Sequence, residues 1–460
     1  MTELGRKPQF ANNGVHHATI NGHRFHLRPT QEGAILWLDG KQPPYLLDQT
    51  AADFVRLTIE AMWRFQQGEG DESNKVTEYV VNEMIKKYRQ PLALRNRLTR
   101  ERVKADLDKL FGTLMGLAEG TCPADIGLGT QQIKPEKWGA PARMDLAVTY
   151  RCNLTCAKCY NGEPQVGAEL TTREWLQVYE KLWQLGVPQI TFTGGEPTLR
   201  EDIVELVREA DEFVTGLVTN GTRLAELAEP LHNASLDYAQ VTIESYRPEI
   251  HDGLTGVVGS HAQTVAGIRA ARQVGLQVVT NTTLTKSNAD HFSETIAWLK
   301  QELGIEDIAC NTLICSGRGT EYRETHGLSD PEILEVLKRA CQTASDLGVN
   351  FQWYSPGCYL VVNPLQLGLG VKQCSAAAHN MMVQPDGGVL PCQSWPTPVG
   401  NILRDPWEKI WNDETCRKLR DHLFAPVECK DCAELAVCGG GCPLDKSPRH
   451  RHQSEGEHAS

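Results

Sequence analysis

The stretch Arg151-Cys-Asn-Leu-Thr-Cys-Ala-Lys-Cys-Tyr160 decides how the rest of the chain is interpreted. It places Cys152, Cys156 and Cys159 in a CxxxCxxC spacing, directly after an apolar segment over residues 145–149 that predicts a β-strand. Three thiolates on one tight loop can hold three irons of a cubane cluster. The fourth iron is then left for a small molecule to chelate. The alternative is a zinc loop, although such loops generally supply four ligands in paired CxxC units.

Alternating strand and helix patterns surround this loop. The clearest helix begins after Thr171, where Glu174 completes a capping box, and it stops at Gly186. Six βα units predict a parallel sheet with right-handed crossovers, and ligands are expected at the carboxyl ends of its strands. The strands are expected over residues 145–149, 189–192, 214–219, 240–243, 277–283 and 307–314.

A second motif, Thr193-Gly-Gly-Glu-Pro197, follows the second predicted strand. Together the two motifs resemble those of the radical S-adenosylmethionine superfamily, and the resemblance covers about residues 142–314. It implies an α/β fold, a partial (βα)6 TIM-like barrel over residues 142–330. It also implies that S-adenosylmethionine chelates the open iron of a [4Fe-4S] cluster. Reductive cleavage of this cofactor gives a 5′-deoxyadenosyl radical.

The resemblance also assigns cofactor contacts to the strand ends. Glycines let the backbone approach closely and a carboxylate suits an ammonium group, so Gly194, Gly195 and Glu196 would bind the methionyl amine. The chain departs from the family pattern at Lys158, where an aromatic or apolar residue is usual, and Tyr160 would supply the missing stacking surface. Further contacts, each of which could equally be a turn or capping residue, are Asn220, Glu244, Ser245, Asn281 and Arg318.

The last quarter of the chain is rich in cysteine. Its spacing is Cys374-x12-Gly387-x4-Cys392, followed by Cys429-x2-Cys432-x5-Cys438-x3-Cys442. This order resembles six of the seven cysteines of the SPASM domain, an auxiliary-cluster extension of radical enzymes, here expected with a bridging helix over residues 331–445. The resemblance implies one auxiliary [4Fe-4S] cluster on Cys374, Cys392 and Cys442, and a second on Cys429, Cys432 and Cys438. The alternative is two structural zinc sites.

Both auxiliary groups need a further ligand. No cysteine follows Cys442, so the second cluster would leave an iron open or use Asp445, Cys416 or His450. Cys358 is a candidate fourth ligand of the first cluster, with a core role as the alternative. Three other cysteines, interpreted as buried core residues, are Cys310, Cys315 and Cys341.

Residues 1–120 predict a small α+β, winged-helix-like module. Apolar stretches over residues 18–27 and 34–47 indicate a hairpin or short sheet, and three helices follow, the first capped by Thr50. The order of elements and the segment Leu46-Leu-Asp-Gln-Thr-Ala-Ala52 resemble the PqqD-like domain. That resemblance implies capture of a precursor peptide's leader as an added strand. The alternative is a purely structural domain.

Composition sets the remaining limits. A hydrophobic share of 40% and a charged share of 23% are typical of globular proteins, and a net charge of −12 argues against nucleic-acid binding through bulk electrostatics. No apolar run is long enough to span a membrane and no signal peptide is evident, so a cytoplasmic location is expected. Residues 121–141 predict a linker rich in Gly and Pro, and residues 446–460 a disordered tail.

The expected activity is hydrogen abstraction from a ribosomally synthesised peptide, leading to a crosslink or an epimerisation. An electron donor such as flavodoxin or ferredoxin would be a partner. One alternative is an enzyme of the same type acting on a tetrapyrrole, lipid or other cofactor precursor, because Gly317-Arg-Gly319 is similar to a motif of haem-pathway relatives. Another is a non-catalytic metal-binding scaffold.

Overall fold

The computed structural model describes residues 16–30, 33–38, 45–65, 72–88, 99–121, 123, 138–161 and 168–445. The chain forms two compact units, the first comprising Met1–Ala140 with Tyr179–Pro188 and the second Pro141–Val178 with Gln189–Ser460. Most of the predicted linker over residues 121–141, and all of the predicted tail over residues 446–460, lie outside the described residues.

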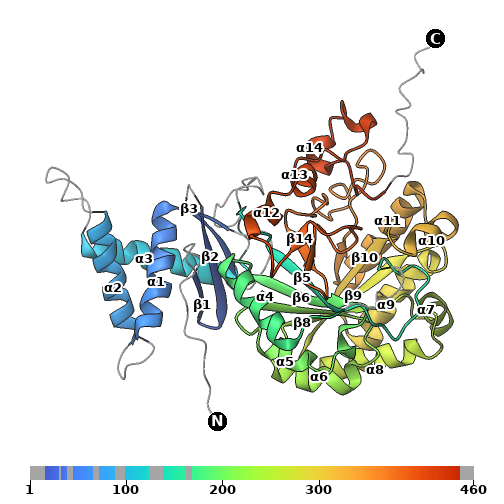
Figure 1. The fold of residues 1–460 in the computed structure, drawn as a ribbon, viewed down its shortest axis with the longest axis horizontal. Helices are drawn as coiled ribbons and strands as arrows, with labels where there is room; N and C mark the ends of the chain where they lie inside the picture. The colour runs from blue at the N-terminus through green and yellow to red at the C-terminus, as the bar shows by residue number, and fades with distance from the viewer. Residues whose placement is uncertain are drawn as a thin grey trace. The chain divides into compact units, whose positions relative to one another are not determined.

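The first unit contains a four-stranded antiparallel sheet in the order β1-β2-β3-β4, followed by three helices (Figure 1). Of the predicted hairpin or short sheet, the structure has the sheet, with four strands in sequence order. The predicted helix cap was wrong, because the Ala51 N–H donates to Asp48 Oδ1 at 2.8 Å, and Asp48 rather than Thr50 caps the first helix. The elements are β1 (His16–Ile20), β2 (His23–Thr30), β3 (Gly33–Leu38), β4 (Tyr45–Asp48), α1 (Gln49–Phe65), α2 (Glu72–Lys87) and α3 (Arg100–Ala118).

Helix α1 holds this unit together because two of its faces are buried. Val55 and Ile59 join a cluster with Phe25 and Leu36 of the sheet. The opposite face joins a second cluster with α2 and α3, through the predicted positions Phe54, Leu57, Ala61 and Phe65. Full burial of one such side chain contributes about 1.5–3 kcal/mol, so α1 supplies much of this unit's core energy.

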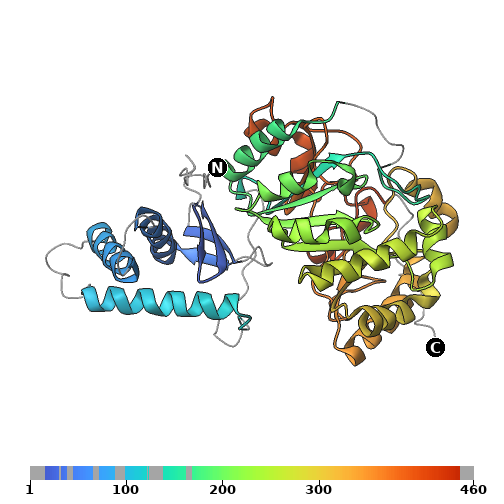
Figure 2. The same cartoon turned by 90° about the horizontal axis from the view of Figure 1, so that it is seen from below.

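Six parallel strands form the centre of the second unit, and all six predicted strands are present. Helices α5, α6 and α8 lie along one side of this sheet and the segment after β11 lies on the other (Figures 1 and 2). The strands are β5 (Arg143–Thr149), β6 (Gln189–Gly194), β7 (Val214–Thr219), β8 (Tyr238–Thr242), β9 (Gln277–Leu284) and β10 (Asp307–Thr312). The connecting helices are α4 (Thr172–Gln184), α5 (Ile203–Arg208), α6 (Leu224–Asn233), α7 (Pro248–Thr255), α8 (Ser260–Gln273) and α9 (Phe292–Leu303).

The start of α4 confirms the predicted capping box. The Thr171 N–H donates to Glu174 Oε2 at 2.8 Å, and the Glu174 N–H donates to Thr171 Oγ1 at 3.3 Å. After the helix, Gly186 has a φ of 74°, a left-handed conformation that favours glycine. Local sequence therefore determines where this crossover begins and ends.

Beyond the six strands the sheet is longer than the sequence indicates. β11 lies parallel to β10 at one edge, and β12 lies parallel to β5 at the other, followed by two antiparallel strands. These strands are two to four residues long, too short for a period to be recognised. The elements are α10 (Gly319–His326), α11 (Asp330–Leu347), β11 (Asn350–Trp353), β12 (Asn380–Val383), β13 (Gly388–Leu390), β14 (Gly400–Asn401), α12 (Trp407–Trp411), α13 (Glu414–Arg420) and α14 (Leu435–Cys438).

Candidate functional site

The loop that carries the cysteine triplet follows β5 and is held by the ends of other strands. The Thr155 N–H donates to the Thr255 carbonyl at 3.0 Å, and the Gly319 N–H donates to the Cys159 carbonyl at 3.3 Å. Asn153 Nδ2 donates to Thr222 Oγ1 at 2.9 Å. These contacts come from segments after β7, β8 and β10. The loop therefore lies at the carboxyl edge of the sheet, where the fold is expected to bind ligands.

The three thiols of this loop are free and close to one another. Burial raises the pKa of the Cys156 thiol to about 12, and negative charges on Glu244, Cys159 and Cys152 add to the increase. Each of these thiols must lose its proton to bind iron, so cluster binding releases protons. Three convergent thiols with no fourth cysteine in the loop fit a cluster that keeps one iron open.

The glycine motif runs directly beside the residues that precede the cysteines. The Gly195 N–H donates to the Thr149 carbonyl and the Glu196 N–H to the Arg151 carbonyl, both at 2.8 Å. A Cβ atom on Gly195 would lie 2.6 Å from the Tyr150 carbonyl oxygen and closer still to that of Arg151. Gly194 has a φ of 136°, which side chains rarely adopt. Both glycines are therefore required by close backbone approach.

We expect Gly195→Ala to displace the motif from the cysteine loop. A misplacement of about 1 Å at a reacting centre can cost on the order of 100-fold in rate, so a loss of that size in S-adenosylmethionine cleavage is expected. The matched control is Gly253→Ala in α7, where an added Cβ meets no atom within 4 Å. Product analysis of both variants checks this, and equal activity in the two would contradict it.

Glu196 is buried and accepts hydrogen bonds from two neighbouring strand ends. Its Oε1 accepts from the Thr198 N–H at 3.1 Å, from Thr198 Oγ1 at 2.5 Å and from Thr219 Oγ1 at 2.7 Å. Its Oε2 accepts from the Asn220 N–H at 2.8 Å. Asn220 in turn donates through Nδ2 to Asn153 Oδ1 at 2.9 Å. Glu196 thus joins the ends of β6 and β7, and Asn220 connects them to the cysteine loop.

The structure gives Lys158 and Glu244 a partnership that the sequence did not indicate. Lys158 Nζ lies 2.5 Å from Glu244 Oε1, with side chains only 8% and 1% exposed. Glu244 Oε2 also accepts from the Thr283 N–H at 3.2 Å. A buried cation requires a counter-ion, which explains how lysine is accommodated before the third cysteine. A lysine at an unusual position with a carboxylate at another strand end is the signal that could have revealed the pair.

The other predicted contact residues differ in their surroundings. Ser245 is buried and accepts through Oγ from the Arg247 N–H at 3.1 Å, which matches its alternative role in a turn. Asn281 donates through Nδ2 to Asn311 Oδ1 at 2.9 Å. Its own Oδ1 is buried without a hydrogen-bond partner among the described residues, so it has acceptor capacity for a ligand.

Two further predicted contact residues lie outside the strands. Arg318 precedes the first turn of α10. Burial raises the pKa of the Tyr160 phenol, which hydrogen-bonds Thr193.

Cys374, Cys392 and Cys442 come together from three separate segments. Burial raises the pKa of Cys392 to about 12, and charges on Cys374 and Cys442 add to the increase. The same causes, burial and then the charge on Cys442, raise the pKa of Cys374 to about 11. We refer to these three residues as the first auxiliary group. Their proximity supports the set that the sequence spacing implied.

The remaining SPASM cysteines lie on two short turns near the end of the described chain. The Cys432 N–H donates to the Cys429 carbonyl at 3.1 Å, and Cys438 ends α14, where the Gly440 N–H donates to its Sγ at 3.4 Å. We refer to Cys429, Cys432 and Cys438 as the second auxiliary group. Their assignment to one cluster continues to rest on sequence spacing.

The candidate extra ligands of the second auxiliary group lie in different places. Cys416 is fully buried within α13. Asp445 forms an ion pair with Arg323 at 3.0 Å, and its negative charge raises the pKa of Cys442 after the larger effect of burial. Asp445 thus lies beside the first auxiliary group, and His450 is outside the described residues.

Within the described ranges, no group of three or more His, Cys, Asp or Glu side chains is arranged to hold one metal ion.

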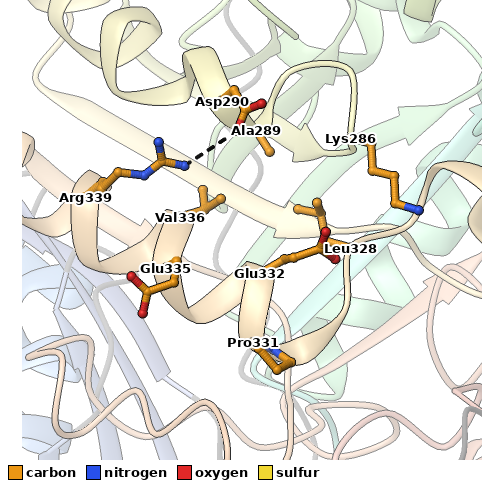
Figure 3. Close-up of a pocket in the computed structure, with 9 residues that line it drawn as sticks. All are labelled: Lys286, Ala289, Asp290, Leu328, Pro331, Glu332, Glu335, Val336 and Arg339. Carbon is orange, nitrogen blue, oxygen red and sulfur yellow. Dashed lines mark ion pairs between the residues drawn. The ribbon is translucent and has the colours of Figure 1, made fainter.

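A surface pocket of about 460 Å³ is lined by residues other than those of the candidate site (Figure 3). It contains no cysteine and no predicted site residue, and an ion pair joins Arg339 to Asp290 at 3.9 Å across it. It is therefore not part of the candidate site. Its lining residues are Lys286, Ala289, Asp290, Leu328, Pro331, Glu332, Glu335, Val336 and Arg339.

Known proteins share these features. A model of the radical SAM superfamily matches residues 146–299, and a model of the SPASM iron–sulfur cluster-binding domain matches residues 374–433. The AdoMet-dependent heme synthase of Methanosarcina barkeri is 30% identical over 318 residues, which are 65% of this chain and 91% of that protein.

Solved structures share the fold. SuiB of Streptococcus suis, bound to precursor peptide SuiA, has a TM-score of 0.64 at 17% sequence identity. The matched region covers 96% of this chain and 99% of the SuiB chain. The enzyme anSMEcpe with bound AdoMet and a peptide has a TM-score of 0.52 at 18% identity, over 65% of this chain and 88% of its own. The first family model includes the cysteine triplet, the second includes Cys374, Cys392, Cys429 and Cys432, and the chain belongs to the radical S-adenosylmethionine superfamily, with a SPASM iron–sulfur domain.

Proposed function

We propose that this radical S-adenosylmethionine enzyme abstracts a hydrogen atom from a ribosomally synthesised peptide and so forms a crosslink or an epimer. Its cofactors are [4Fe-4S] clusters and S-adenosylmethionine. When bound, they supply the 5′-deoxyadenosyl radical. In this proposal Cys152, Cys156 and Cys159 hold the cluster that cleaves the cofactor, and the two auxiliary groups hold one cluster each.

The chain's own part in this chemistry is to bind, to orient and to exclude water. Gly194 and Gly195 let the strand-end backbone approach the cysteine loop, and Glu196 would accept the methionyl ammonium while it joins β6 to β7. The buried acceptor on Asn281 would receive a hydroxyl or amine of the cofactor. Tyr160, Ser245, Asn220 and Arg318 line the same strand ends and complete the proposed contacts.

One observation supports a peptide as substrate: the first unit is a sheet and three helices with their own core and with strand edges at both ends. Among the described residues β4 pairs only with β3, and Leu46 of β4 is 40% exposed. An extended peptide can add to such an edge through main-chain hydrogen bonds and place alternate side chains in pockets. The structural likeness to a protein bound to its precursor peptide supports the same proposal.

We expect Leu46→Glu to weaken peptide binding about tenfold or more, because it replaces an exposed apolar contact on the edge with a charge, and each 1.4 kcal/mol is a factor of ten. The probes are labelled peptides translated from short reading frames beside the gene, titrated into the full chain. Lys75→Glu on the exposed surface of α2 is the matched control. Binding of no such peptide by the unaltered chain would contradict the peptide proposal.

A specific observation favours a second candidate, a tetrapyrrole substrate. The curated relative is a heme synthase, and Gly317-Arg-Gly319 lies in the loop between β10 and α10, next to the cysteine loop. Titration with haemin, followed by its visible absorption band, tests this candidate. A saturable shift together with no peptide binding would replace the peptide proposal. Flavodoxin or ferredoxin is the proposed electron donor in either case.

The described part of the chain contains no helix long and apolar enough to cross a membrane.

A further inference from the structure

The loop between β10 and α10 connects the two sets of cysteines in the second unit. Ser316 Oγ donates to the Tyr160 carbonyl at 3.2 Å, one residue after the cysteine triplet. The same hydroxyl lies 2.9 Å from the Ser394 carbonyl, two residues after Cys392. A single side chain thus contacts both the residue after the cysteine triplet and the segment that follows Cys392.

Cys315 occupies the position before this serine, and a second set of contacts leads from it to Cys442. Arg323 Nη1 donates to Cys315 Sγ at 2.8 Å, and Arg323 Nη2 donates to Asp445 Oδ2 at 3.0 Å. The Asp445 N–H in turn donates to the Cys442 carbonyl at 3.0 Å. Two sets of contacts, through Ser316 and through Arg323, therefore place Cys315 near the residues that follow Cys392 and near Cys442. The pKa of Cys442 is accordingly raised by burial first and also by the charges on Asp445 and Cys315.

The surroundings of Cys315 favour a ligand over a core residue. The thiol is only partly buried, and its hydrogen bond comes from a guanidinium cation. Hydrogen bonds to ligating sulfur tune iron–sulfur clusters, and the Arg323 guanidinium is placed to donate one to Cys315. By contrast, Cys310 on the preceding strand is fully buried, as the sequence predicted for a core cysteine.

The residue after Cys358, the fourth ligand suggested by sequence, lies toward the second auxiliary group. The pKa of the Tyr359 phenol is raised by burial and then by the charge on Cys438. Tyr359 therefore lies near Cys438.

We propose that Cys315 is the fourth protein ligand of the cluster held by Cys374, Cys392 and Cys442. This inference rests on the proposed assignment of those three cysteines to one cluster. With four thiolates the cluster has no open iron, so substrate does not coordinate it. Its position next to the Cys159 loop then suits it to exchange electrons with the substrate radical or with the first cluster.

The test uses a parent variant of the full chain in which Cys152, Cys156 and Cys159 are all alanine, so that only auxiliary clusters contribute. Iron and sulfide are measured after anaerobic purification, and electron paramagnetic resonance spectra are recorded before and after reduction. Adding Cys315→Ala should remove one cluster's worth of iron or leave a three-iron cluster, seen as a new signal in the oxidised sample. Adding Cys315→Ser should keep the iron but shift the signal of the reduced cluster, because oxygen replaces sulfur. The matched control is Cys341→Ala, a partly buried cysteine on α11 outside both groups.

The outcomes separate this inference from the assignment beneath it. If Cys315→Ala and Cys315→Ser both match the parent in iron, sulfide and spectra, the inference is wrong although the auxiliary clusters exist. The same holds if Cys358→Ala, and not Cys315→Ala, produces the three-iron signal. A parent without iron would overturn both the inference and the proposed auxiliary clusters. Circular dichroism identifies an unfolded variant, and the serine variant then decides.

Discussion

Replacing Cys156 with alanine will remove the cofactor-cleaving cluster and lower the formation of 5′-deoxyadenosine by more than about 10⁴-fold, because enzymes accelerate their reactions by about 10⁶-fold or more. The physical reason is that the loop offers only three thiols, Cys152, Cys156 and Cys159. With two thiolates the loop cannot hold a cubane with a single open iron.

The measurement is iron and sulfide content together with 5′-deoxyadenosine, determined by mass spectrometry after anaerobic reduction. Cys341→Ala again serves as the control, since it removes a thiol of α11 without touching the loop. Auxiliary iron should remain in Cys156→Ala. Full activity in that variant would contradict the assigned site, and zinc without sulfide in the unaltered chain would support the scaffold alternative.

The strand pattern of the second unit could be predicted in part because β5, β6 and β7 are buried along nearly their whole length. A capping box also marks the helix that follows β5. The short strands β12 to β14 could not be predicted, since each gains its stability from an existing sheet edge rather than from its own sequence. The CxxxCxxC motif could be recognised from cysteine spacing alone, without knowledge of the fold.

Tertiary partners account for what the sequence did not reveal in the site. From the sequence, Lys158 is only a departure from a family pattern. The structure places Lys158 Nζ 2.5 Å from a carboxylate oxygen of Glu244, which lies 86 positions along the chain at another strand end. From the sequence, Cys315 is interpreted as a core cysteine, whereas in the structure it is only partly buried and accepts a hydrogen bond from Arg323. Both features depend on which strand ends meet, and no local pattern encodes that.

The carboxyl edge of the sheet explains why these features gather in one place. Parallel strands bring all their following loops to the same edge, so the cysteine loop, the glycine motif and the β10–α10 loop meet although 156 positions separate Tyr160 from Ser316. The SPASM segment extends the same sheet through β12, which pairs with β5. β5, which precedes the cysteine loop, is thus also paired with the strand that lies between Cys374 and Cys392.

Breaking the buried pair of Lys158 and Glu244 should have the largest effect on stability. We expect Lys158→Met to lower the free energy of unfolding by about 3–5 kcal/mol, because it leaves the Glu244 carboxylate buried without its cation. Glu244→Gln should cost a comparable amount by isolating the ammonium group. The measurement is urea unfolding of the apo proteins under anaerobic conditions.

The double variant distinguishes charge pairing from packing. When Lys158→Met and Glu244→Gln are combined, no unpaired charge remains, and the double variant should be more stable than the sum of the single losses predicts, with a coupling of about 0.5–3 kcal/mol. Additive losses would mean that the two side chains contribute through packing alone. The Thr283 N–H donates to Glu244 Oε2 at 3.2 Å and can still donate to the amide oxygen of a glutamine. Glu244→Gln therefore leaves this backbone N–H with a hydrogen-bond partner. The recovered stability can then be attributed to the ion pair, which is the feature that lets this chain place a lysine beside its third cysteine.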